Sequence, residues 1–195
     1  MKIYLAKLIS YAFIPPISLI IIFIILANQI YADYSYTTKT LLIASTFGTI
    51  LPIIVFLIFR KMGKIINDDA TRKEERTVPF LIGIGLAFTA LILSYFYELH
   101  PLILGLWIAY ILIQIVVILT NLSWKISAHM VGIGISYATF IFLFQTDYFY
   151  VLIIPIIIGW ARLTLKVHTS MQVIVGFLLG TIPTYFILLK AIKLF

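Results

Sequence analysis

The stretch PLILGLWIAYILIQIVVILT, residues 101–120, runs for twenty positions without one charged side chain. A helix of about 20 apolar residues is long enough to cross the roughly 30 Å hydrocarbon core of a bilayer. The stretch therefore predicts a transmembrane helix. The whole chain has the same character, because 63% of its 195 residues are hydrophobic and only 11% are charged. Such a composition excludes an ordinary water-soluble domain and indicates a membrane protein.

Further apolar segments lie on both sides of residues 101–120. Hydropathy and chain breaks predict seven helical segments, at about 5–31, 40–61, 79–97, 101–120, 129–145, 148–163 and 168–191. No linker or change of composition divides them, so residues 1–195 are expected to form one integral-membrane domain. The predicted fold class is all-α, a multi-pass transmembrane bundle of about six to seven spans. Pro15 and Pro16 are expected to kink the first segment.

Three polar segments, 62–78, 124–129 and 161–168, are each separated from the next by two predicted spans. They should therefore lie on one membrane face. Eleven of the fourteen cationic residues fall on this face and three on the other, which by the positive-inside rule makes the motif face cytoplasmic. The eleven are Lys2, Lys7, Arg60, Lys61, Lys64, Arg72, Lys73, Arg76, Lys125, Arg162 and Lys166.

The chain has few residues that could bind a metal or act as a nucleophile. The chain has no cysteine, which excludes disulfides, thiolate metal sites and a cysteine nucleophile. Its three histidines are His100, His129 and His168, and its seven carboxylates are scattered. Asp68 and Asp69 could together hold one divalent ion, but a carboxylate-rich metal cage is hard to build, so a chemistry without metal is expected.

The first polar segment, NDDATRKEERTVP at 67–79, is strongly charged. As a short helix it would place Arg72 and Arg76 on one face with Lys73 adjacent. Guanidinium groups offer paired donors to phosphate oxygens, so the cluster suits a phosphate. Contact with lipid headgroups is the alternative explanation.

The second polar segment, NLSWKISAHM at 121–130, carries Ser127 and His129 just before an apolar run. Ser127 is placed as a helix N-cap, and the backbone N–H groups at a helix start form an anion site. His129 would face an anion bound there. An ordinary cap beside an interfacial histidine is the alternative.

The third polar segment, ARLTLKVHTSMQ at 161–172, carries Arg162, then His168 six positions later and Gln172 four beyond that. Residues at i and i+4 share a helix face, so Gln172 can hold the His168 ring through one nitrogen and leave the other open. An oriented imidazole of this kind suits a nucleophile or a base.

Together these segments resemble the type 2 phosphatidic acid phosphatase family, which shares its fold with the vanadium haloperoxidases. The resemblance rests on SAH at 127–129, on ARLTLKVHTSMQ at 161–172 and more loosely on RTVP at 76–79, and it covers about residues 60–185. It implies a phosphatidic acid phosphatase/haloperoxidase-like core of membrane helices that hydrolyses a lipid phosphate monoester or diphosphate without metal or cofactor.

The resemblance also implies roles for individual residues. His168 would be the nucleophile that forms a phosphohistidine, His129 the general acid, and Gln172 the side chain that orients the His168 ring. The phosphoryl oxygens would be held by Arg162, Arg76, Ser127 and the N–H groups near Ala128. The expected partners are a lipid phosphate substrate and membrane lipids, with no nucleic acid.

Among the departures of the chain from the family pattern, two bear on the chemistry. The lysine of the first motif is replaced by Asp69, so Arg72, Lys73 or Lys125 would have to supply its charge. The aspartate of the third motif is Gln172, and an amide orients a histidine without stabilising its cationic form. Restoring Asp at position 172 would therefore discriminate a weakened enzyme from a binding protein.

Several alternatives stay open from the sequence. The chain could be a catalytically weak or inactive relative that binds phospholipid headgroups, and an intramembrane prenyltransferase or a transporter is a minor alternative. Gly176 and Gly180 suit close helix packing, either within the chain or in a homo-oligomer. A cell membrane, in particular a bacterial inner membrane, is the expected location. The family commonly works on the outer face, whereas the charge count favours the cytoplasmic face.

Overall fold

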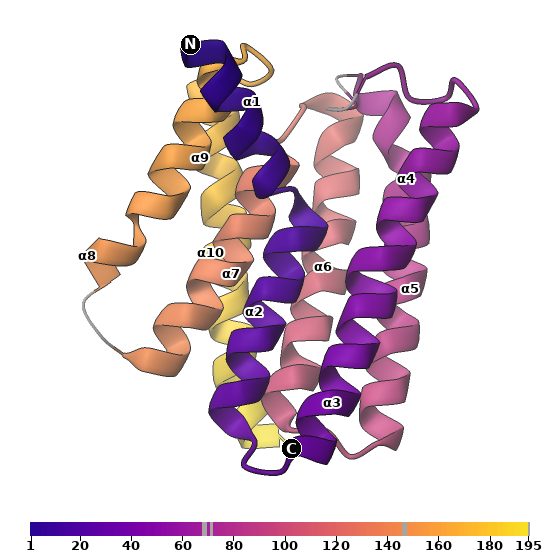
Figure 1. Ribbon diagram of the computed structural model, residues 1–195, viewed down its shortest axis with the longest axis vertical. Coiled ribbons are helices and arrows are strands. Elements are labelled where there is room, and N and C mark those ends of the chain that lie inside the picture. The colour runs from indigo at the N-terminus through magenta and orange to yellow at the C-terminus, as the bar shows by residue number, and fades with distance from the viewer. Residues whose placement is uncertain (68–69, 71, 146–147, 195) are drawn as a thin grey trace.

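The computed structural model describes residues 1–67, 70, 72–145 and 148–194, apart from the side chains of Lys73, Tyr148 and Phe149. Helices account for most of these residues and no strand occurs among them (Figure 1), which confirms the all-α prediction for the described chain. The α-helices are α1 (Lys2–Ala12), α2 (Pro15–Ile30), α3 (Tyr34–Ile43), α4 (Leu51–Lys61), α5 (Thr77–Phe96), α6 (Pro101–Ser123), α7 (Ala128–Phe144), α8 (Tyr148–Val151), α9 (Ile153–Thr164) and α10 (Ser170–Leu194). A π-helix, η1 (Ala44–Ile50), joins α3 to α4, and a 3₁₀ turn, η2 (Lys73–Arg76), precedes α5.

Four helical stretches in the described chain are long and apolar enough to cross a membrane. They are Tyr34–Lys61, Glu74–Phe96, Pro101–Ser123 and Ser170–Leu194. The pair α1 and α2 adds a fifth if it forms one span, and α7 and α9 are apolar but shorter. Large apolar side chains such as Leu57, Leu81 and Phe88 remain more than half exposed, as expected for a surface that faces lipid.

The predicted helical segments correspond closely to the observed helices, with one break in each of two segments. The first segment is divided at Phe13 and Ile14 into α1 and α2, whose axes differ by 54°. The bend comes directly before Pro15 and Pro16, which confirms the expected kink, because a proline disfavours helical geometry in the residue before it. The predicted segment 148–163 is divided into α8 and α9. The residues between Pro79 and Ser127 form the α5–α6 hairpin.

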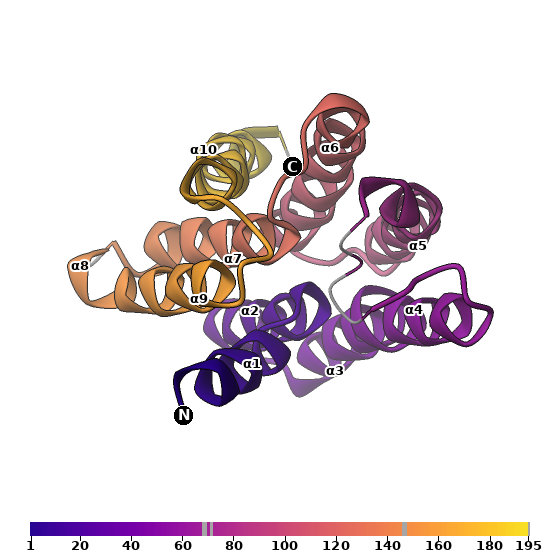
Figure 2. The same ribbon diagram turned by 90° about the horizontal axis from the view of Figure 1, so that it is seen from above.

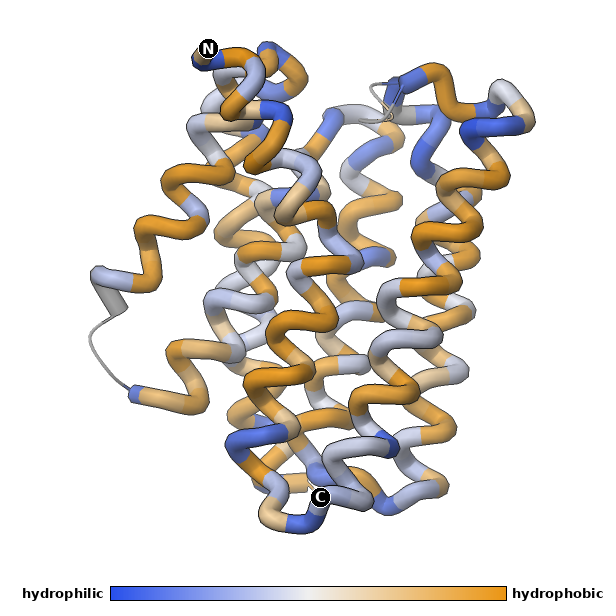
Figure 3. The backbone as a smooth tube through the Cα atoms, in the orientation of Figure 1, coloured by the Kyte–Doolittle hydropathy of each residue, from blue (hydrophilic) through white to orange (hydrophobic). Residues whose placement is uncertain are grey.

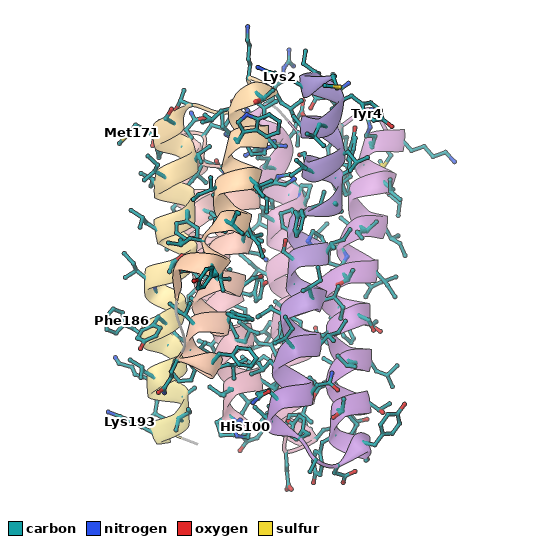
Figure 4. The ribbon with its side chains drawn as sticks, turned by 60° about the vertical axis from the view of Figure 1, so that its left-hand side comes forward. Lys2, Tyr4, His100, Met171, Phe186 and Lys193 are labelled. Atoms are coloured by element: carbon teal, nitrogen blue, oxygen red, sulfur yellow. The ribbon has the colours of Figure 1, made fainter. Side chains whose placement is uncertain are left out.

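The described parts of the three polar segments lie at one end of the bundle, as their spacing predicts (Figure 1). Polar residues gather at both ends of the molecule and apolar residues between them (Figure 3). Lys2 and Met171 lie at the motif-bearing end, whereas His100 and Lys193 lie at the opposite end (Figure 4). The N-terminal helix α1 therefore reaches the same end as the candidate site.

A core of apolar side chains joins α2 to α6 and α7. Trp107 on α6 is 1% exposed, and its ring centroid lies 4.6 Å from that of Phe23 on α2. Seen end-on, α7 lies between α2 and α10, and α1 packs beside α9 (Figure 2). The two helices that carry the second and third motifs at their first turns, α7 and α10, are thus direct neighbours.

Glycines allow α7 and α10 to approach within backbone contact. A Cβ atom at Gly180 would overlap the carbonyl oxygen of Val131 and lie 3.0 Å from Cα of Gly134. A Cβ atom at Gly176 would lie 3.0 Å from the carbonyl oxygen of Ser127. Gly176 and Gly180 are therefore used for packing within the chain and do not supply a separate oligomer face.

Gly180→Ala is expected to destabilise the protein by at least about 2 kcal/mol, because the new methyl group meets backbone that has no room to yield. Thermal unfolding in detergent micelles, followed by circular dichroism, measures the change. Gly85→Ala is the matched control, since a Cβ atom there has no neighbour within 4 Å. Equal melting temperatures for the two variants would show that the α7–α10 contact is not close.

Candidate functional site

Hydrogen bonds tie the three polar segments together. Arg76 Nη1 donates to the carbonyl oxygen of Ile126 at 2.9 Å, and Lys125 Nζ donates to that of Val167 at 2.9 Å. The backbone N–H of Ser127 donates to the carbonyl oxygen of Gln172 at 3.4 Å. Segments about 40 to 50 residues apart in sequence therefore meet at one place.

The turn from α9 to α10 presents His168. Lys166 ends α9 in the left-handed conformation, with φ +55°, and its N–H donates to the carbonyl oxygen of Leu163. Helices commonly end with a residue in this conformation. The chain then reverses through Val167 and His168, so that His168 lies just before the first turn of α10 and is only 7% exposed.

Thr169 and Gln172 form a capping box at the start of α10. Gln172 N–H donates to Thr169 Oγ1 at 3.4 Å, and Thr169 N–H donates to Gln172 Oε1 at 3.1 Å. This reciprocal pair is the arrangement that Ser/Thr-x-x-Glu/Gln sequences adopt at helix starts. The capping box fixes which amide atom of Gln172 faces His168, because only the oxygen can accept from a backbone N–H.

The predicted contact between Gln172 and His168 is present and it determines the histidine tautomer. Gln172 Oε1 lies 3.1 Å from His168 Nδ1. Since this oxygen only accepts, Nδ1 must carry the hydrogen in the neutral ring, and Nε2 is left with its lone pair. His168 Nε2 is buried and has no hydrogen-bond partner among the described residues. The ring is thus held as a nucleophile or a base requires.

Ser127 lies at the N-cap of α7, as predicted, but its hydroxyl makes no capping bond. The residue is 0% exposed, and within the described part of the chain Oγ has no hydrogen-bond partner. The first N–H groups of a helix, from Ala128 onward, have no acceptor within the helix itself. Buried polar atoms without a partner are rare, so Ser127 and His168 point to a polar ligand between these segments.

Three cations surround His168. Burial of the ring, followed by the positive charges of Arg76, Lys125 and Arg162, lowers the pKa of His168 to about 3. Each charge disfavours a second positive charge on the imidazole. The same cations attract an anion, so the site combines a neutral imidazole with a surplus of positive charge.

We expect His168 to be neutral at pH 6, with its hydrogen on Nδ1, because a pKa near 3 leaves the ring protonated only in strong acid. An exposed histidine titrates near pH 6.5. Nitrogen-15 spectra of histidine-labelled protein in micelles, with His168→Gln for assignment, report both the tautomer and the pKa. A His168 signal that titrates near pH 6.5, or a hydrogen on Nε2, would contradict this expectation.

Arg162 lies in the last turn of α9, where a cation interacts favourably with the helix dipole. It is 1% exposed, and its Nη1 donates to the hydroxyl of Ser10 on α1. Sequence inspection missed Ser10. It lies within an apolar segment, and only the packing of α1 against α9 brings it to Arg162.

His129 lies in the first turn of α7 and contacts the same residue of α1. Its Nε2 lies 3.2 Å from the carbonyl oxygen of Ser10 and 3.5 Å from the Ser10 hydroxyl. Because the carbonyl only accepts, Nε2 of His129 carries a hydrogen. Ser10 thus contacts both His129 and Arg162. A cavity of about 150 Å³ opens here, between α1 and the loop after α9.

The first-motif cations do not lie as the sequence suggested. The predicted helix face shared by Arg72 and Arg76 does not form, because only a 3₁₀ turn covers Lys73–Arg76 and Arg72 precedes it. Arg72 is exposed, whereas Arg76 is 5% exposed and donates from Nε to the carbonyl oxygen of Ala70 at 2.8 Å. The side chain of Lys73 lies outside the described residues.

No group of three or more histidines and carboxylates converges within the described ranges. Asp68 and Asp69, the pair considered for a divalent ion, are outside them. Asn121 is a second residue that sequence inspection missed, since its Oδ1 accepts from the N–H of Ile126 at 3.1 Å and so shapes the turn before Ser127.

The described site therefore joins two histidines, two serines and three cations from α1 and the three polar segments. Comparison with family models, with curated proteins and with solved structures finds no match to this chain.

Proposed function

We propose that this protein is a membrane lipid phosphatase of the type 2 phosphatidic acid phosphatase kind. It would hydrolyse a lipid phosphate monoester or diphosphate through a phosphohistidine on His168. The observation that carries the proposal is the His168 ring, which is held by Gln172 and keeps an unpartnered, buried Nε2 among Arg76, Lys125 and Arg162. A lone pair aimed into a cationic, buried site suits attack on phosphorus.

The reaction follows from these positions. His168 Nε2 forms a bond to phosphorus while the bond from phosphorus to the lipid oxygen breaks. His129, protonated on both ring nitrogens when the anionic phosphate is bound, gives a proton to that oxygen. Water then attacks the phosphohistidine, with His129 as the base, and inorganic phosphate leaves. Arg76, Lys125 and Arg162 offset the charge on the phosphoryl oxygens, and the proposal needs no metal or cofactor.

The proposed core comprises six to seven spans. The α7 helix has 17 residues and would extend about 26 Å, and α9 has 12 residues and would extend about 18 Å. With the bent α1–α2 pair, these two helices complete such a bundle around the four longer ones. The apolar exterior would receive the lipid tail in a cell membrane.

A second candidate function is binding of a phospholipid headgroup without turnover. It is favoured by the capping box, which gives Gln172 a structural reason to be present besides any catalytic one. A neutral amide also stabilises the imidazolium less than a carboxylate does. This alternative predicts bound phospholipid but no released phosphate.

Phosphate release from detergent-solubilised lipids separates the two functions. The substrates are phosphatidic acid, phosphatidylglycerophosphate, an isoprenyl diphosphate and a lipid A phosphate. The enzyme should release phosphate from at least one of them, and orthovanadate should block the release because it mimics the pentacoordinate phosphoryl group. Headgroup binding without release from any of the four would support the second candidate.

A further inference from the structure

The cavity between α1 and the loop after α9 has polar side chains on one part of a lining that also includes Ile14, Leu165 and Val167. Lys7, Ser10 and Tyr11 line it from α1, and His129 lines it from α7. Ser10 is 5% exposed, and its hydroxyl accepts from Arg162. An ammonium group, two hydroxyl groups and an imidazole thus gather around one space.

The cavity lies next to His129, the proposed donor of a proton to the leaving oxygen. It is lined by His129 and by Val167, the residue directly before His168. His129 is the proton donor to the leaving oxygen in the proposed function, on which this inference rests. The cavity therefore receives the leaving group, because whatever lies beyond that oxygen must begin next to His129.

The size and chemistry of the cavity restrict that leaving group. Its volume is about 150 Å³. One phosphate group fits such a space. The alcohol that phosphatidic acid releases is uncharged and would not use a lysine there, whereas the leaving group of a lipid diphosphate carries an anionic phosphate directly at the leaving oxygen.

We infer that this cavity binds the inner phosphate of a lipid diphosphate, with Lys7 as the cation that recognises it. His168 Nε2 bonds to the terminal phosphorus, the bond from that phosphorus to the bridging oxygen breaks, and the electron pair stays on that oxygen. The leaving group is a lipid monophosphate, which takes the proton of His129. Water then releases the terminal phosphate from His168, so that atoms and charge balance.

The competing role for Lys7 is contact with membrane headgroups alone, since its side chain is exposed. Lys2 is the matched control for that role, because it lies on the same helix, is also exposed and does not line the cavity. A general headgroup contact would act alike on every lipid substrate, whereas a subsite for the second phosphate acts on diphosphates alone.

The kinetic test compares a C15 prenyl monophosphate with the diphosphate of the same chain. Lys7→Gln should lower kcat/KM for the diphosphate about tenfold and for the monophosphate less than twofold, and Lys7→Arg should restore most of the loss. Lys2→Gln should change neither. Equal losses on both substrates, or no loss on either, overturn the inference.

A binding test keeps the inference separate from the proposed function. The probe is the methylene-bridged diphosphonate analogue of the prenyl diphosphate. It is titrated into wild type and into Lys7→Gln in micelles, and the prenyl monophosphonate serves as the control ligand. Lys7→Gln should raise the Kd of the diphosphonate about tenfold and leave the Kd of the monophosphonate unchanged. If wild type hydrolyses nothing, the proposed function fails while this titration still decides whether the subsite exists. An unchanged Kd overturns the subsite.

Discussion

Replacing His168 with alanine is expected to lower phosphate release by at least about a thousandfold, because alanine has no side-chain nitrogen that could bond to phosphorus. The loss should appear in kcat and not only in KM. Wild-type protein quenched in alkali during turnover should carry acid-labile phosphate, since a phosphohistidine survives alkali and not acid. The variant should carry none.

A loss of activity in His168→Ala can be assigned to the missing imidazole and not to a disturbed fold. The capping box of Thr169 and Gln172 does not depend on the imidazole, so α10 should still begin at the same residue in His168→Ala. His100→Ala is the control, since His100 lies at the opposite end of the molecule (Figure 4). Full activity in His168→Ala would exclude His168 as the nucleophile.

Gln172→Glu is expected to raise kcat by at least about tenfold, because a carboxylate in place of the amide stabilises the positive charge that develops on His168. The resemblance to the family's third motif alone suggested Asp at this position. The structure favours Glu, since Glu keeps the length of Gln and places a charged oxygen where Oε1 now accepts from His168 and Thr169. Glu also fits the capping box.

The added carboxylate should also change the pH dependence in a defined direction. The present pKa of about 3 keeps His168 neutral across the ordinary range. A neighbouring negative charge favours the imidazolium and raises that pKa, so the acid limb of the rate profile should move to higher pH. Met171→Glu adds the same charge to the same helix turn on an exposed side chain and should change neither kcat nor the profile. No gain in Gln172→Glu would favour the binding protein.

The helices could be predicted well because their signal is local. Runs of apolar residues and the breaks between them determine most boundaries to within a few residues, and Pro15 and Pro16 mark the bend. The use of Gly176 and Gly180 was undecided from the sequence, since contact with α7 and contact with a second chain require the same small residues. Only the backbone positions of Ser127 and Val131 distinguish the two.

The candidate site was predictable where it depends on short spacings. His168 and Gln172 are four residues apart, and Ser127 directly precedes an apolar run, so both features follow from helix geometry. The same reasoning failed for Arg72, because a 3₁₀ turn replaced the expected helix. It missed the capping box, although Thr-x-x-Gln is a recognised signal. Ser10 could not have been found this way, since its role depends on packing between segments about 150 residues apart.

The bend between α1 and α2 sets how deep the candidate site lies. Ser10 is eight residues beyond Lys2, which along a helix is about 12 Å inward from that end of the bundle. Because His129 and Arg162 both bond to Ser10, they are recessed by a similar distance behind α1. A phosphate bound there would lie below the outermost turns of the protein. Water that attacks a phosphoryl group held beside His129 and Arg162 would have to pass these outermost turns.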